Sequence, residues 1–127
     1  GSRPTAHYPW RSLLDRGVCV AFGSDAPVEP ADPFRGIHAA VTRQRVDGEP
    51  HGGREPEERI TLTEALRAYS LAPARAAGLA EHTGRLKSGR LADFITVDQD
   101  PYEIPEADLW RIRTEATIVG GQIVFHR

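Results

Sequence analysis

The sequence predicts an α/β fold in which a helix, a buried parallel strand, a loop and a second helix precede a small antiparallel unit. Three observations support this prediction. Residues 18–22 form a short apolar run rich in β-branched residues, which is typical of a buried parallel strand. Apolar residues recur at helical spacing before and after that run, and this order suits a parallel sheet. Beyond residue 84, turns and short apolar runs replace the helical pattern.

The first helix and the strand lead directly to one acidic residue. Residues 10–17 place apolar side chains at helical spacing and end at Gly17, after which the apolar run begins. The run breaks at Gly23, and Asp25 is the acid that follows an apolar strand through a glycine turn. In barrel enzymes, catalytic groups lie at such strand ends. We therefore expect the carboxyl end of the strand to place Asp25 on a loop.

A second helix and a surface loop follow. Asp32 is placed to cap a helix that Pro33 opens and that ends near Gly48. Its apolar face consists of Phe34, Ile37, Ala40 and Val41. From residue 47 to 58 the composition changes to glycine, proline and charge, which predicts a mobile surface loop that is also a candidate lid.

Two more helices are predicted before the antiparallel unit. Thr61 and Glu64 have the spacing of a capping box, in which each side chain satisfies a free amide at the helix start. Pro73 opens a further short helix that runs through Ala77 and stops at Gly78. The best candidate for a domain boundary lies at residues 79–84.

The last third of the chain has the pattern of short strands with one helical turn between them. Residues 94–97 are a strand candidate, and residues 118–125 have the pattern of a hairpin that turns at Gly120 and Gly121. Between them, residues 105–111 predict a helical turn with Trp110 as an anchor in the core.

Composition excludes several classes of function. The 127 residues carry 16 basic and 18 acidic side chains spread along the chain, so no basic stripe is available for nucleic acid. No apolar stretch approaches the roughly 20 residues of a membrane helix, and no signal peptide is evident. The default location is therefore the cytoplasm. Cys19 is expected to be a small buried hydrophobe within the strand. Because methionine is absent and the chain begins with Gly1 and Ser2, we expect an excised piece of a longer protein.

Four segments together resemble the C-terminal end of the amidohydrolase superfamily, in the same order. They are residues 23–27, 61–79, 84–94 and 117–124. The match is greatest with amidohydrolase family 3, the branch that includes N-substituted formamide deformylase-like enzymes. The resemblance implies the last strand-helix unit of a metal-dependent (β/α)8 barrel in residues 1–80, and part of a small β-sandwich subdomain in residues 81–127. It also implies a small-molecule amide substrate and a divalent metal, zinc by preference.

In such enzymes the acid that ends the last strand binds metal or activates water, and Asp25 is the matching position. The sequence departs from the family pattern elsewhere, because its five histidines are scattered and form no His-x-His pair. Lys87 lies in a turn, which does not suit a buried carbamate. His38 is predicted to be structural or at the surface, and His51 to lie on the loop. We therefore expect this chain alone to bind no metal.

For three polar residues the sequence favours a role outside catalysis. Ser24 lacks a Gly-x-Ser-x-Gly elbow, so packing or hydrogen bonding is expected of it. Arg43 and Arg45 lie on the predicted helix after the loop and are expected to be solvated, with contact to an anionic substrate as the alternative.

Three hypotheses follow. The first is a C-terminal portion of a metal-dependent hydrolase of non-peptide carbon-nitrogen bonds, inactive alone. The second is a self-associating interaction module, a homo-oligomer without catalysis, because unpaired sheet edges and apolar faces favour association. In the third, another chain supplies the missing segment and restores activity.

Overall fold

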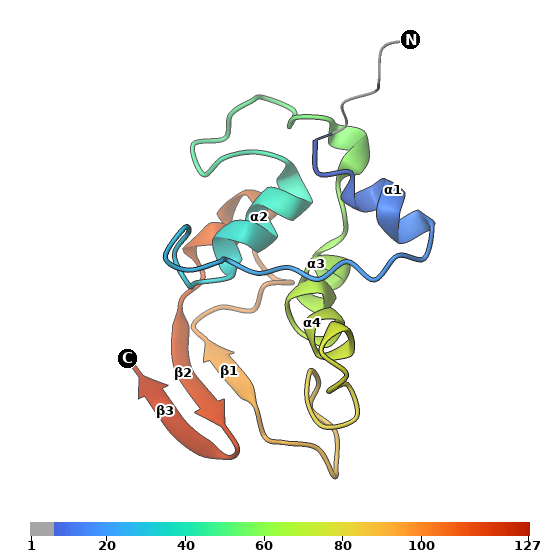
Figure 1. The fold of residues 1–127 in the computed structure, drawn as a ribbon. Helices are drawn as coiled ribbons and strands as arrows, with labels where there is room; N and C mark the ends of the chain where they lie inside the picture. Colours follow the sequence, from blue (N-terminus) through green and yellow to red (C-terminus); the bar gives the residue numbers. More distant parts are fainter. Residues whose placement is uncertain (1–6) are drawn as a thin grey trace.

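The computed structural model describes residues 7–127 as a mixed helical and β structure, with the helices above a small sheet (Figure 1). The α-helices are α1 (Trp10–Asp15), α2 (Phe34–Thr42), α3 (Leu62–Tyr69) and α4 (Leu71–Ala76). Two 3-10 helices are η1 (Pro56–Glu58) and η2 (Glu106–Arg111). The strands are β1 (Phe94–Val97), β2 (Thr114–Val119) and β3 (Gln122–His126). Within residues 7–127 no helix is both long and apolar enough to cross a membrane.

The core forms where α2 packs against η2, with α3 beside them. The apolar face predicted for α2 is buried as expected, and its four residues belong to one cluster with residues from the other helices and from the connecting segments. The buried members of this cluster are Phe34, Ile37, Ala40, Val41, Ile60, Ala65, Leu109 and Ile112. Helix α2 is thus the element around which the rest of the chain is arranged.

The predicted capping box is present at the start of α3. The Thr61 hydroxyl accepts a hydrogen bond from the Glu64 backbone amide, and the Glu64 carboxylate accepts one from the Thr61 amide at 2.8 Å. Helix α4 follows almost without a break, and Pro73 is in its first turn, where a missing amide hydrogen costs nothing. The capping box and Pro73 thus predicted the presence of both helices correctly.

The sheet is three-stranded and antiparallel, in the order β1-β2-β3. The predicted hairpin is confirmed, because β2 and β3 pair around a turn at Gly120 and Gly121. Every residue of β3 is exposed, so this edge of the sheet has no cover among the described residues.

The prediction of a strand at residues 18–22 is wrong for this chain. The segment is extended and crosses the molecule between α1 and α2, but it pairs with no strand among the residues described (Figure 1). The predicted parallel sheet is likewise missing there, since the described sheet is antiparallel. The physical reason is that a parallel strand needs neighbours across a ladder of hydrogen bonds.

Three smaller predictions are also wrong. Cys19 is exposed rather than buried, because the extended segment that carries it pairs with no strand among the described residues. The core anchors of η2 are Leu109 and the following Ile112, both fully buried, whereas Trp110 is half-buried beneath the Arg111 guanidinium. Helix α2 ends at Thr42 rather than near Gly48, since the next residue is left-handed.

Candidate functional site

The residues before Asp25 are anchored to α3. The backbone amide of Phe22 donates a hydrogen bond to the carbonyl of Ala68 at 2.8 Å. The Phe22 ring lies between two other aromatic rings, with centroids 5.1 Å from Trp10 and 5.4 Å from Tyr69. This contact fixes where the extended segment ends, and therefore where the loop that carries Asp25 begins.

Asp25 lies in a tight turn with a left-handed backbone. Its φ is 50°, and its carbonyl accepts a hydrogen bond from the amide of Val28 at 2.9 Å. Aspartate tolerates this conformation better than most residues, but such backbones concentrate at functional sites. Asp25 lies on a loop, as predicted, and its side chain is exposed. The backbone thus holds the acid out toward solvent.

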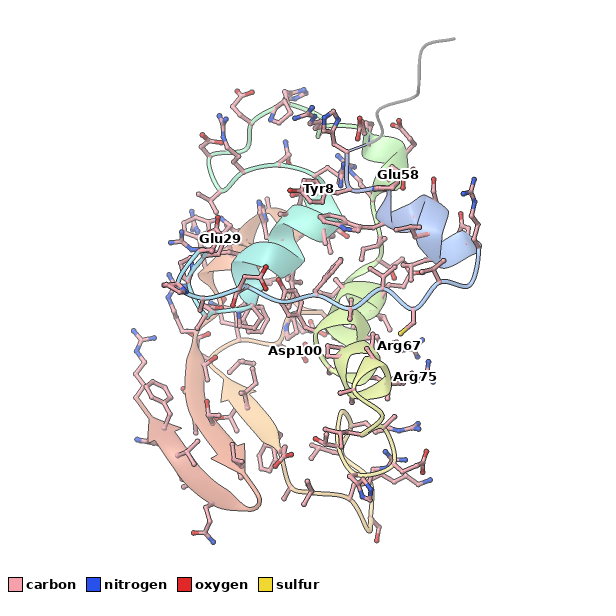
Figure 2. All side chains as sticks on the ribbon, viewed as in Figure 1. Tyr8, Glu29, Glu58, Arg67, Arg75 and Asp100 are labelled. Carbon is pink, nitrogen blue, oxygen red and sulfur yellow. The ribbon has the colours of Figure 1, made fainter. Side chains whose placement is uncertain are left out.

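A cavity of about 510 Å³ lies beside this turn. Gly23 and Ser24 line it from the loop, Gly36 from α2 and Tyr69 from the end of α3. Glu29 also lines it, from the loop that leads into α2 (Figure 2). Ser24 therefore borders the cavity through its position in the loop.

The Tyr69 side chain connects the cavity to Asp25. Partial burial, and to a smaller extent the negative charge of Asp25, raise the pKa of the Tyr69 phenol. The phenol also lies directly over Gly36: a β-carbon at residue 36 would overlap the hydroxyl and lie 3.0 Å from Cζ. A glycine in the first turn of α2 thus makes room for the hydroxyl at the wall of the cavity.

The histidines do not gather around Asp25. His38 is buried, and its two ring nitrogens lie 3.1 Å from the carbonyl oxygen of Glu106 and 3.3 Å from that of Arg45. It is structural, as the sequence favoured, because it joins α2 to η2 and to the following loop. His51 is exposed on the loop of residues 47–58. Within residues 7–127, no group of three or more histidine, cysteine, aspartate or glutamate side chains is arranged to hold a metal ion.

Arg43 serves the fold rather than a ligand. Its guanidinium is buried, stacks 4.8 Å from the ring centroid of Trp10 and forms an ion pair with Glu55 at 3.2 Å. It also donates to backbone carbonyls, among them that of Tyr8 at 3.1 Å (Figure 2). The expectation of a solvated Arg43 is therefore wrong. Arg45 is exposed as expected and pairs with Asp47 at 3.1 Å.

Sequence reasoning did not identify Tyr69 or Gly36 as neighbours of the candidate acid. Tyr69 lies within the helix predicted to start at Thr61, and nothing in the sequence spacing relates it to a glycine 33 positions earlier. The one sequence signal is a glycine in the first turn of a helix. It lowers helix stability there, which indicates that another side chain approaches the helix backbone closely.

Comparison with known proteins relates the whole chain to one family. A family model described as "Amidohydrolase family" matches residues 2–125. The chain is 34% identical over 120 residues to the N-substituted formamide deformylase of Arthrobacter pascens, covering 94% of this chain and 22% of that protein. It is 36% identical over 118 residues to the Protein LONG AFTER FAR-RED 3 of Arabidopsis thaliana, covering 93% of this chain and 20% of that protein.

A solved structure agrees with these matches at the level of fold. The crystal structure of an amidohydrolase from Thermotoga maritima superimposes with a TM-score of 0.60 at 22% identity, covering 94% of this chain and 26% of that one. The chain thus spans only about a quarter or less of the proteins that it matches. Because the family model covers nearly the full sequence, the chain belongs to the amidohydrolase family.

Proposed function

We propose that this chain is the C-terminal portion of a metal-dependent hydrolase that cleaves non-peptide carbon-nitrogen bonds, and that Asp25 is its catalytic acid-base residue. One observation carries the proposal: in a chain of the amidohydrolase family, the acid singled out by the sequence lies in a left-handed turn beside a cavity of about 510 Å³. The name of one relative, N-substituted formamide deformylase, supports amides of the formamide type as the proposed substrate class.

The chemistry requires a group that moves one proton. In our proposal the Asp25 carboxylate accepts a proton from a water molecule as the water oxygen attacks the carbonyl carbon of the amide. The carbon-nitrogen bond then breaks and the proton passes to the departing nitrogen. A formamide therefore yields formic acid and an amine, and Asp25 returns to its starting state.

The residues of this chain do not by themselves fit a metal site, because Asp25 has no partner ligands among the described residues. A divalent ion, zinc by preference, would activate water at neutral pH by lowering its pKa if the longer protein holds one. We propose that the other ligands belong to a longer protein, in which Asp25 is a ligand or the base. The isolated chain is then expected to be inactive.

The unpaired extended segment fits this proposal. In our interpretation residues 18–22 are the last strand of a (β/α)8 barrel whose other strands lie elsewhere in the longer protein, with residues 1–80 ending the barrel domain. Residues 81–127 then belong to a β-sandwich subdomain. We also propose a cytoplasmic location, which rests on composition alone.

The test compares Asp25→Asn with wild type in the longer protein that contains this chain. Hydrolysis of an N-substituted formamide is expected to fall by about 100- to 10,000-fold, the usual contribution of a positioned acid-base group. Asp15→Asn is the control, because Asp15 is exposed and pairs only with Arg11. Wild-type activity in Asp25→Asn would refute the assignment. Tight stoichiometric zinc in the isolated chain, or hydrolysis by it, would refute its inactivity.

A second candidate function is self-association without catalysis. The observation in its favour is the sheet edge: all five residues of β3 are exposed, among them Ile123 and Phe125. Exposed apolar edge strands favour pairing with another chain. Sedimentation of the isolated chain at micromolar concentration tests this, and a clean monomer would exclude it.

A further inference from the structure

The phenol of Tyr69 is held in place by its neighbours but has a free polar end. The ring is half-buried and packs edge-on against Phe22, with centroids 5.4 Å apart. Its other side rests on α2 at Gly36, where only the absence of a β-carbon leaves room for the hydroxyl. Within residues 7–127, this hydroxyl forms no hydrogen bond to a backbone or side-chain group.

Tyr69 and the loop that carries the candidate acid border the same cavity. Tyr69 lines the cavity of about 510 Å³ together with Gly23 and Ser24, which immediately precede Asp25 in the chain. The charge of Asp25 is close enough to raise the pKa of the phenol. The Asp25 carboxylate lies next to this lining, since an ideal β-carbon at Gly23 would be 3.4 Å from its Oδ1. A ligand in the cavity therefore lies against Tyr69 at the end of α3 and close to the loop that carries Asp25.

We propose that the Tyr69 hydroxyl donates a hydrogen bond to the carbonyl oxygen of the amide substrate, and that Tyr69 is thus a second catalytic residue of this site. The inference rests on the proposed function. An amide offers one strong acceptor, its carbonyl oxygen, because the nitrogen lone pair is delocalised. A phenol is a donor as long as it keeps its proton, and both burial and Asp25 favour the protonated form.

The rigidity of the phenol is what makes the donor effective. A donor held in position before the reaction stabilises the charge that develops on the carbonyl oxygen without a cost for reorganisation. Phe22 provides this restraint by its edge-on contact with the ring, and Gly36 by its close approach to the hydroxyl. The interaction strengthens as the oxygen gains charge, so it acts on turnover more than on binding.

The experiment measures kcat and KM of Tyr69→Phe in the longer protein, with an N-substituted formamide as substrate. Loss of one such donor is expected to lower kcat by about 100-fold with little change in KM. Tyr102→Phe is the matched control, because its exposed hydroxyl only contacts Thr63, at 3.0 Å, and its kinetics should stay at the wild-type level. Unfolding by urea checks that Tyr69→Phe retains its fold.

Asp25→Asn is measured alongside to separate the two proposals. If Asp25→Asn is inactive while Tyr69→Phe keeps the wild-type kcat, the role of Tyr69 is refuted and the proposed function stands. If wild type hydrolyses no amide, or Asp25→Asn is fully active, both are refuted.

A second readout does not depend on the Phe variant. In the Asp25→Asn protein labelled at tyrosine Cζ, formamide itself should shift the Tyr69 resonance and leave that of Tyr102 unchanged. An unshifted Tyr69 resonance at saturating formamide would overturn the inference.

Discussion

Gly36 and Tyr69 are packed so closely that no other residue at position 36 would leave the phenol where it is. An added β-carbon would overlap the hydroxyl and lie 3.0 Å from Cζ and 3.4 Å from Cε2. The contact joins the first turn of α2 to the last residue of α3, the two helices that frame the cavity beside Asp25. The position of the Tyr69 hydroxyl is therefore a property of this pair of residues.

Gly36→Ala is expected to destabilise the chain even though alanine is the better helix former. The helical preference of alanine gains about 1 kcal/mol, whereas forcing an extra carbon into a packed site costs roughly 1–3 kcal/mol. Urea unfolding of the 127-residue chain should show a net loss. The loss should shrink in the double variant with Tyr69→Phe, because the atom in closest overlap is then gone. Equal losses in both backgrounds would contradict the contact.

The decrease of folding stability at acid pH should reflect protonation of Glu58. Its carboxylate lies beside α1 (Figure 2) and accepts hydrogen bonds from the Ser12 hydroxyl and, at 2.9 Å, from the Ser12 backbone amide. These bonds hold the pKa of Glu58 below its ordinary value of 4.5. Since the folded state prefers the charged form, the stabilisation is present above that ordinary value and is lost as the pH falls through the lowered pKa.

Ser12→Ala removes the larger of these two effects, so the pKa of Glu58 should rise toward its ordinary value. The free energy of unfolding should then depend less on pH in the acid range than it does in wild type. Urea midpoints measured from neutral pH to about pH 3 test this, across the window set by the unfolded and folded pKa values. Ser88→Ala is the control, because Ser88 is exposed in a turn. An unchanged acid profile for Ser12→Ala would count against the Ser12 contact.

Asp25→Asn should lower the pKa of Tyr69. Burial is the main cause of the raised pKa and remains in the variant, so the pKa should move only part of the way back toward 10.0. Titration of tyrosine Cζ by NMR resolves Tyr69 from the other tyrosines. Asp47→Asn should leave it unchanged, since Asp47 pairs with Arg45 on an exposed loop. An unchanged Tyr69 pKa in Asp25→Asn would mean that the Asp25 carboxylate does not lie near the phenol.

The sequence predicted those elements whose signals are local. The capping box at Thr61 and Glu64 and the Gly120-Gly121 turn are each complete within a few residues, and both were found as expected. The run at residues 18–22 failed because a strand is defined by its partner, and no partner lies within the described residues.

The candidate site could be predicted only in part for the same reason. The position of Asp25 on a loop followed from the glycine turn that precedes it. Its catalytic role remains a prediction. The contact between Gly36 and Tyr69 depends on how α2 and α3 cross, which no periodicity in the sequence encodes. Trp110 illustrates a further limit, because a large aromatic residue was expected in the core position that Leu109 takes.

Asp93 provides a last prediction, at the junction between the helices and the sheet. Its carboxylate accepts a hydrogen bond from the Thr83 hydroxyl at 2.9 Å and another from the Gly120 backbone amide at 2.8 Å. It therefore ties the loop after α4 to the turn between β2 and β3. Asp93→Ala should cost roughly 1–3 kcal/mol, because hydrogen bonds to a charged acceptor contribute more than neutral ones.

The loss of stability caused by Asp93→Ala should be greatest at the hairpin of β2 and β3. Hydrogen exchange is expected to speed up at Gly120 and the neighbouring β3 amides in Asp93→Ala, while α2 keeps its protection. Thr83→Val removes one of the two bonds and should cause a smaller change than Asp93→Ala. Asp98→Ala is the comparison for a carboxylate bound elsewhere, because Asp98 accepts from the Arg113 amide at 2.8 Å and does not reach the hairpin turn. Faster exchange at Gly120 in Asp98→Ala but not in Asp93→Ala would reverse the assignment.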